Sequence, residues 1–274
     1  GTEEVSNGNF SQEGSELVTN GDFATDSDWL KVNATISDGK GNLDSTSSTS
    51  ILFQQNVLTV GKTYKANFDV SNYNGIGTCA LINSDGVTQF EITSNGNADF
   101  YFTHGGASAN LVFRAVASGA FSIDNVSVKE VGQDWNLGSG WSIGDDKAVC
   151  DGTNNADITQ VGSIVGKTYK ATLSVSENNV GRVNVYIGGT FAGQTTNGAT
   201  GDFTFYATAT DTNLIRIRSN NSFNGSITNI SVKEVGQDWA FVGDFETDGT
   251  KAFITSASQY SQLTNQIGVN YLLS

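Results

Sequence analysis

The sequence SVKEVGQDW occupies residues 127–135 and returns unchanged at residues 231–239. A second sequence, GKTYKA, occupies residues 61–66 and returns at residues 166–171. The first pair is displaced by 104 positions (127 to 231) and the second by 105 (61 to 166). A unit of this length is domain-sized, because solenoid and propeller repeats are only about 20 to 50 residues long. The chain therefore contains tandem copies of one domain.

Each repeat has the pattern of a series of short strands. Val, Ile, Thr, Phe and Tyr recur in alternating runs, with turn residues at intervals of about ten positions. In YKANFDV, residues 64–70, every second side chain is apolar, and YKATLSV at residues 169–175 repeats the alternation. This period of two is typical of strands with one buried face. The sequence predicts an all-β protein with two tandem β-sandwiches and a partial third repeat at the C-terminus.

The last strand of each repeat contains a change of phase. Its apolar positions switch parity at Asp124-Asn125 in the first repeat and at Thr228-Asn229 in the second. A slip of one residue would turn the apolar side chains outward, so we predict a β-bulge at both places. A shared bulge indicates a shared fold.

The repeats give the predicted domain boundaries. They are residues 1–15 for an N-terminal extension, 16–133 for repeat one, 134–238 for repeat two and 239–274 for the partial third repeat. The motif VTNGDF at residues 18–23 opens repeat one, whereas its copy VSNGNF at residues 5–10 has no repeat of its own and is interpreted as a spare strand.

About 35 residues are too few for a third sandwich, so the C-terminal segment must pack on repeat two, pair with another chain or continue into a longer protein. Unpaired strands are templates for other chains. We therefore predict that both termini pair with neighbouring subunits in a homo-oligomer, with the C-terminal segment folding back on repeat two as the alternative.

Composition limits the classes of partner. The 274 residues are 37% hydrophobic and 15% charged, which is a globular balance, and their formal net charge is −14. The acidity and the scattered Lys and Arg residues argue against nucleic-acid binding. No apolar stretch approaches the ~20 residues needed to span a bilayer, so we predict no membrane insertion. We expect a soluble chain whose leader, if it is secreted, has been removed.

Catalytic and metal-binding chemistry finds little support in the sequence. Cys79 and Cys150 lie at non-equivalent places in different repeats, so we interpret them as free structural thiols. His104 is the single histidine and lies in a Gly-rich stretch, where we expect an exposed loop. The adjacent acids Asp145 and Asp146 do not fit the spacing of a glycosidase pair. The chain is predicted not to be an enzyme.

The motifs at the two ends of repeat one resemble those of carbohydrate-binding-module jelly rolls. These are NGDF at residues 20–23 and FSIDNVSV at residues 121–128. The linked motifs NGDF, DW, GKTY and VSVKEV are also similar to repeats in structural proteins of tailed phages, marine ones in particular. The resemblance implies jelly-roll sandwiches and a structural calcium in repeat one near Asp22 and Asp124. In repeat two the position of Asp124 is Thr228, which disfavours a second site.

Sugar binding needs an exposed aromatic face beside planar hydrogen-bonding groups. One candidate is Trp141. The others, which have Asn and Gly residues nearby in the sequence, are Tyr73, Tyr186 and Phe191. Trp141 is the preferred one because repeat one has no aromatic residue at the matching place. The alternative is that Trp141 closes the end of the sandwich.

Together, these observations favour a non-enzymatic virion structural protein, tail- or capsid-associated, with weak adhesion to a glycan or host surface. Its expected partners are other virion proteins, copies of itself and a cell-surface glycan. The alternative is a carbohydrate-binding fragment of a secreted bacterial protein that binds or degrades polysaccharide.

Overall fold

The computed structural model describes residues 1–82, 86–236, 245–247 and 252–254. Within these ranges the regular elements are all β-strands, which confirms the predicted all-β class of tandem jelly-roll sandwiches. The described residues form two compact units. One contains residues 10–133 with 142–147, and the other contains residues 1–9 with the rest of the described chain. No helix of the described residues is long and apolar enough to cross a membrane.

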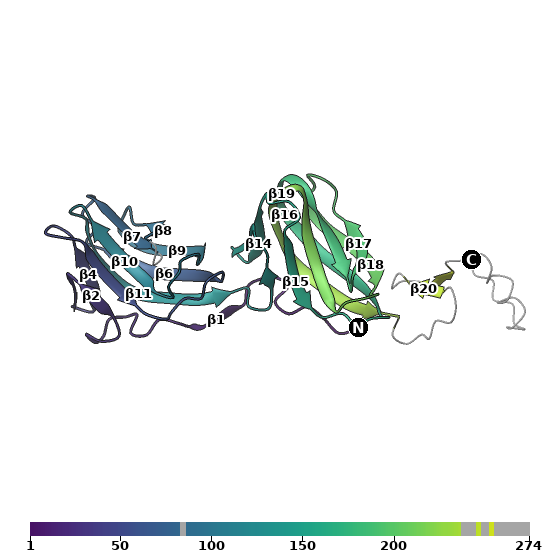
Figure 1. Cartoon of the computed structure of the whole chain (residues 1–274), viewed down its shortest axis with the longest axis horizontal. Helices are drawn as coiled ribbons and strands as arrows, with labels where there is room; N and C mark the ends of the chain where they lie inside the picture. Colours follow the sequence, from purple (N-terminus) through teal and green to yellow (C-terminus); the bar gives the residue numbers. More distant parts are fainter. Residues whose placement is uncertain (83–85, 237–244, 248–251, 255–274) are drawn as a thin grey trace, which may run out of the picture. The chain divides into compact units, whose positions relative to one another are not determined.

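Repeat one is a sandwich of two antiparallel sheets (Figure 1). Its first sheet has the order β3-β4-β11-β6-β9, with β1 paired to β11, and its second has the order β2-β5-β10-β7-β8. The strand bounds are β1 Glu13–Glu16, β2 Leu30–Val32, β3 Ala34–Ser37, β4 Lys40–Asp44, β5 Ser50–Gln54, β6 Thr63–Ser71, β7 Thr78–Ile82, β8 Thr88–Glu91, β9 Gly96–Thr103, β10 Leu111–Val116 and β11 Ala120–Val131.

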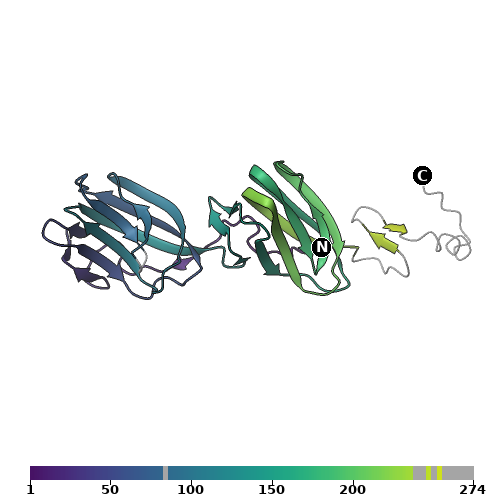
Figure 2. The same cartoon turned by 45° about the horizontal axis from the view of Figure 1, so that its top comes forward.

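Repeat two uses the same order with fewer breaks. Strands β16 and β19, the long green and yellow-green ribbons of Figure 2, each correspond to two strands of repeat one. The first half of β16 pairs with the second half of β19, and β18 and β14 flank them in the first sheet. The second half of β16 pairs with the first half of β19, and β17 and β15 flank them in the second sheet. The bounds are β12 Asn136–Leu137, β13 Trp141–Gly144, β14 Lys147–Asp151, β15 Asp157–Val161, β16 Thr168–Ile187, β17 Thr190–Gln194, β18 Gly201–Thr208 and β19 Leu214–Val235.

The predicted alternation places the core. In β6 the side chains of Tyr64, Ala66, Phe68 and Val70 are buried, and in β16 so are those of Tyr169, Ala171, Leu173 and Val175. Around Phe68, the Phe113 ring lies edge-on at 5.0 Å between centroids. Edge-to-face contacts of this kind add to the free energy of burial. The alternation prediction is confirmed in both repeats.

Both cysteines are buried and free, as predicted. Burial disfavours the charged thiolate and raises the pKa of the Cys79 thiol to about 11. For Cys150 burial is likewise the largest cause of a raised pKa. These thiols are therefore structural side chains of the cores.

Both predicted bulges are present. Between Asp124 and Ser127, β11 gains one residue against β6, and β19 gains one against β16 beside Thr228. The bulge residues Asn125 and Asn229 have φ of 51° and 52°, in the left-handed region that asparagine tolerates better than most residues. The extra residue keeps the apolar side chains on both sides of the bulge in the core.

The segment at residues 16–22, here called docking segment one, lies against the last strand of repeat one. The Glu16 carboxylate accepts hydrogen bonds from the Val128 amide at 2.9 Å and the Ser127 hydroxyl at 2.5 Å. The Trp29 Nε1–H donates to the Asn20 carbonyl at 3.0 Å. These bonds fasten the start of the repeat to its end.

Residues 3–9, here called docking segment two, make the same bonds to repeat two. The Glu3 carboxylate accepts from the Val232 amide at 2.7 Å and the Ser231 hydroxyl at 2.5 Å. The Trp135 Nε1–H donates to the Asn7 carbonyl at 3.1 Å. The prediction of a spare strand at residues 5–10 is therefore wrong. Residues 1–9 belong to the compact unit of repeat two, because their bonding partners lie in that repeat. Repeat one separates them from these partners in the sequence.

The predicted third repeat lies almost wholly outside the described residues. Within them, β20 (Phe245–Thr247) pairs with β21 (Ala252–Ile254) as an antiparallel hairpin. The boundary at residue 239 stays a prediction.

Candidate functional site

The four predicted glycan-binding side chains lie in different environments. Trp141 is only 5% exposed, its Nε1–H donates to the Ala156 carbonyl at 3.0 Å, and its ring lies 6.0 Å from that of Phe223. The expectation that Trp141 presents an open face is therefore wrong, because the indole fills the core of repeat two. Tyr73 is half-buried against the core of repeat one. The role of Tyr73 in binding stays a prediction.

Tyr186 and Phe191, by contrast, form a surface pair. They are Cα partners on β16 and β17, and their ring centroids are 5.3 Å apart. Phe191 is 50% exposed. Val185 and Ile187, on either side of Tyr186, are buried, so the Tyr186 side chain points out of the sandwich. The structure thus brings together two of the four predicted residues on the outer face of the second sheet.

Arginines surround this pair. Arg216 on β19 is the Cα partner of Tyr186, and its guanidinium carbon lies 4.1 Å from the centre of the Tyr186 ring. Arg218 lies two positions along the same face, and Arg182 lies on β16 four positions before Tyr186. Three of the chain's four arginines therefore share one face of a protein with net charge −14. We call this the arginine face, and define it as Arg182, Asn184, Tyr186, Phe191, Arg216 and Arg218.

The arginines differ in how far they are neutralised. Arg218 makes a bidentate pair with Asp157, at 2.7 and 2.8 Å, and this hydrogen-bonded carboxylate raises the pKa of Arg218. Arg182 and Arg216 form no ion pair or side-chain hydrogen bond with any of the described residues. The Nε atoms of both are buried and unpartnered, as is Oδ1 of Asn184. Buried polar atoms are normally hydrogen-bonded, so this face has unused hydrogen-bonding capacity.

The sequence analysis did not select the arginines or Asn184. The available signal was the alternation in RVNVY (182–186) and IRIR (215–218), where every second residue is polar and the others are buried. The equivalent strand of repeat one, LVFRAV (111–116), has Val112 at the position of Arg216. This comparison needs the strand register, which the structure supplies.

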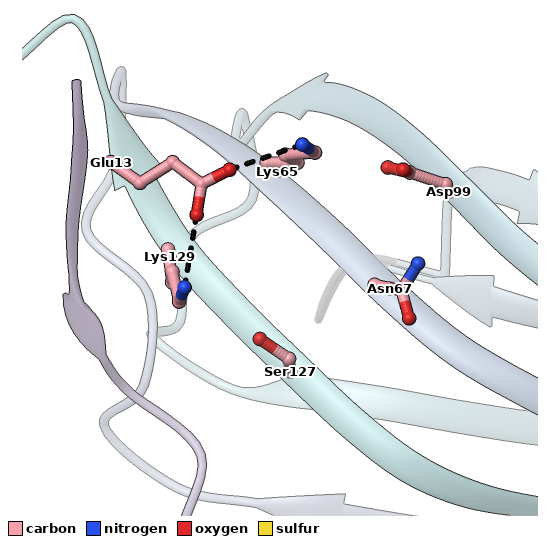
Figure 3. A pocket seen from close by; sticks show the side chains of 6 residues that line it. All are labelled: Glu13, Lys65, Asn67, Asp99, Ser127 and Lys129. Carbon is pink, nitrogen blue, oxygen red and sulfur yellow. Dashed lines mark hydrogen bonds and ion pairs between the residues drawn. The ribbon is translucent and has the colours of Figure 1, made fainter. Parts of the chain in front are cut away.

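A polar cleft of about 230 Å³ lies on the first sheet of repeat one (Figure 3). Glu13 lies between Lys129 and Lys65, at 2.9 and 3.0 Å from their ammonium nitrogens. These hydrogen bonds, that of Lys129 first, lower the pKa of the Glu13 carboxyl. Asn67, Asp99 and Ser127 complete the lining. Because the two acids of the lining, Glu13 and Asp99, balance the charges of its two lysines, the cleft has less free charge for a ligand than the arginine face has.

The predicted calcium ligands make local bonds. Asp22 accepts from the Ala24 amide at 3.3 Å, and Asp124 accepts from the Asn125 amide at 2.7 Å. Among the described residues, no three His, Cys, Asp or Glu side chains gather as a metal site. Calcium takes six to eight oxygens, so backbone carbonyls would have to supply most of them. Calcium in repeat one stays a prediction, and a chelator that lowers the melting temperature would support it.

His104 differs from its predicted exposed position. The side chain is fully buried, with Nε2 2.8 Å from the Ser108 carbonyl oxygen. The backbone also pairs, because the Gly61 amide donates to the His104 carbonyl at 2.7 Å. The residue closes a loop against the sandwich.

Comparison with known proteins found no matching family model and no matching curated protein. Among solved structures, the tandem CBM22-1 and CBM22-2 domains of Paenibacillus barcinonensis Xyn10C are 9% identical, with 82% of this chain and 99% of that chain covered and a TM-score of 0.33. The tandem CBM51 modules of a Streptococcus pneumoniae family 98 glycoside hydrolase are 7% identical, with coverage of 70% and 83% and a TM-score of 0.25.

A triple jelly-roll protein of an archaeal virus turret is 13% identical, with 76% of this chain and 59% of that chain covered and a TM-score of 0.23. Tandem carbohydrate-binding modules and viral jelly rolls are thus among the structures similar to this chain. At such low scores these similarities imply nothing about what this chain binds.

Proposed function

We propose that the chain is a non-enzymatic structural and adhesive protein of a virion, and that it binds carboxylate-bearing glycans through the arginine face of repeat two. The single observation that carries the binding proposal is the stacked Tyr186–Arg216 pair beside the exposed Phe191 ring. The motifs shared with phage structural repeats support the virion role. The proposal is of adhesion, with no reaction assigned to the chain.

Aromatic and cationic groups together suit an acidic sugar. The exposed Phe191 ring can receive the apolar face of a pyranose, while the guanidinium of Arg216 can bind a carboxylate through paired N–H donors. Stacking on Tyr186 holds the Arg216 guanidinium in one plane, which lowers the entropy lost on binding.

A densely charged nucleic acid is a poorer ligand for this face. The guanidiniums of Arg182 and Arg216 are the un-neutralised charges of this face, but the chain as a whole carries a net charge of −14. A polyphosphate backbone therefore meets net electrostatic repulsion. An acidic oligosaccharide adds apolar ring faces to its carboxylates, and the exposed Phe191 ring and the Arg216 guanidinium can use both kinds of group. This combination of groups favours the glycan.

A binding assay with matched ligands tests the proposal. The full chain is titrated with oligogalacturonate, oligoguluronate and oligoglucuronate, and with the methyl ester of each, which keeps the sugar ring and removes the charge. We expect the acids to bind and the esters to bind at least tenfold more weakly, about 1.4 kcal/mol. Equal binding of acid and ester, or no binding of any acid, contradicts the proposal.

The variants Arg216→Ala and Phe191→Ala locate the site. Each should weaken binding of the acid about tenfold or more. Arg114→Ala is the matched control, because Arg114 occupies the position of Arg218 on the second sheet of repeat one. It should leave affinity unchanged. Binding of single-stranded DNA that Arg216→Ala abolishes would replace the glycan with a nucleic acid.

The same surface would serve a secreted polysaccharide-binding protein. Location separates the two roles, because a virion protein co-purifies with particles through a density gradient. Recovery of the chain only from the culture medium of a bacterium would contradict the virion role while leaving the glycan site intact.

A further inference from the structure

We propose that docking segment two is transferable, and that repeat two binds this segment from a second copy of the chain, which links copies by strand exchange. The proposal does not depend on glycan binding. It rests on the bonds between residues 3–9 and repeat two, and on the path of the chain between them.

The two docking segments make matching sets of bonds. The Val126 amide donates to the Gly21 carbonyl and the Ile230 amide to the Gly8 carbonyl, both at 2.9 Å. The side-chain amide of Gln54 accepts from the Thr19 amide at 3.2 Å, and that of Gln160 accepts from the Ser6 amide at 2.7 Å. With the Glu and Trp bonds above, repeat two has a complete receiving site for a short peptide.

The connection between segment and site differs in the two repeats. Docking segment one continues directly into Trp29 of its own sandwich. Docking segment two is joined to Trp135 only through repeat one, residues 10–133. Docking segment two can therefore leave its site without breaking the sheets of repeat one. The chain connections between the strands of repeat two also stay the same. The donors and acceptors of the receiving site are left without these partners when the segment is absent, and the segment that fills the site can come from a second copy.

The chemistry of the contact suits exchange. The Glu4 amide donates to the Val232 carbonyl at 2.9 Å, and Glu3 pairs across the strand with Lys233. Main-chain bonds of this kind are the basis of strand addition between chains. Val5 is buried within the segment and Phe10, which follows it at the end of the VSNGNF motif, is 1% exposed, so exchange must move these two apolar side chains together with the segment. Each copy carries one segment and one site, which permits a reciprocal dimer or an open series of copies.

Disulfide trapping in trans tests the exchange in the full chain. One copy carries Glu3→Cys and the other carries Lys233→Cys. Because these residues are antiparallel Cα partners, the thiols can bond when the segment of one copy occupies the site of the other. The copies are mixed, equilibrated in mild urea to release the segments, returned to buffer and oxidised. We expect a disulfide-linked heterodimer on a non-reducing gel.

Lys170→Cys provides the matched control, because Lys170 is exposed on the neighbouring strand and pairs with Lys233 rather than with Glu3. A mixture of Glu3→Cys and Lys170→Cys should give at least fivefold less heterodimer. Equal yields from the two mixtures would show random collision and overturn the proposal.

A peptide experiment gives a second readout. The full chain, in the mild urea that releases its own docking segment two, is titrated with a fluorescently labelled peptide of residues 1–12, and binding is followed by the anisotropy of the label. The Gly8→Val peptide is the negative control, because a side chain there would overlap the Ile230 carbonyl. The Thr2→Ala peptide, changed at an exposed residue, should bind normally. Failure of the native peptide to bind, together with no heterodimer, overturns the proposal.

Discussion

The outer faces of the second sheets differ between the two repeats, although the strand register is the same. In repeat one, Val112, Ile82 and Ala80 form an apolar cluster with Ile51 and Phe53 packed against it. In repeat two the corresponding positions hold Arg216, Tyr186, Asn184, Asp157 and Thr159. The inward side chains of the central strands, Leu111 and Phe113 in repeat one and Ile215 and Ile217 in repeat two, stay apolar in both. The difference separates residues required by the fold from residues that can serve a ligand.

The docking segments give the opposite comparison. Their bonds are the same in both repeats, but one segment is local and the other arrives from before repeat one. Equal bonds with unequal connections predict unequal responses to changes that expel the segment, and equal responses to changes that remove a single bond. The following variants use both comparisons.

The largest effect is expected at the paired glycines. A methyl group at Gly21 would overlap the Val126 carbonyl, and one at Gly8 would overlap the Ile230 carbonyl. Gly21→Ala should cost repeat one about 3 kcal/mol, since segment one cannot leave without distorting its own sandwich. Gly8→Ala should cost repeat two less, because segment two can detach. Urea unfolding of each variant measures both.

Gly105→Ala is the control, because a methyl group there meets no atom within 4 Å. It should leave unfolding unchanged. A Gly8→Ala loss as large as that of Gly21→Ala would show that segment two is an integral part of the fold of repeat two.

The outer faces should differ in their contribution to stability. Phe53→Ala removes a half-buried ring from the apolar cluster and should cost about 2 kcal/mol. Phe191→Ala removes a ring that is half exposed and should change the free energy of unfolding by less than about 0.5 kcal/mol. Thermal unfolding compares the two. A large loss for Phe191→Ala would mean that the arginine face is structural.

The tryptophan bonds should be worth the same in both repeats. Trp29→Phe and Trp135→Phe each remove an N–H that donates to a docking-segment carbonyl. Each should cost about 1 kcal/mol for the hydrogen bond, with a further loss from the smaller ring. Chemical denaturation of the single variants checks this equality. A negligible loss at Trp135 alone would mean that segment two is weakly held.

The repeats could be predicted because identical motifs return at one displacement in the sequence. The alternation and both bulges could be predicted because each depends on residue spacing within one strand. The duplication at residues 5–10 was visible as well, but its partner was not. Sequence order placed it outside both repeats, whereas the bonds of Glu3 and Asn7 place it in repeat two. The arginine face was missed because it depends on cross-strand register. The prediction for Trp141 was wrong because it depended on the lack of an aromatic residue at the matching place of repeat one. That lack is equally compatible with an exposed ligand-binding ring and with a buried ring.

The smallest predicted effect is the pH dependence of the stability that Glu13 gives to repeat one. Hydrogen bonds from Lys129 and Lys65 hold the pKa of Glu13 below its ordinary value of 4.5. A carboxyl with a lowered folded-state pKa contributes stability that is complete above the unfolded-state pKa and lost as the pH falls through the folded-state value. Because the carboxylate is about a third exposed, the contribution should be well under 1 kcal/mol. The difference in melting temperature between the native chain and Glu13→Gln should therefore be small at pH 6 and shrink as the pH falls below the ordinary pKa of 4.5. Added salt should reduce it at pH 6, since exposed ion pairs are screened. A difference that does not shrink with acid would mean that Glu13 stabilises the sheet through packing and not through charge.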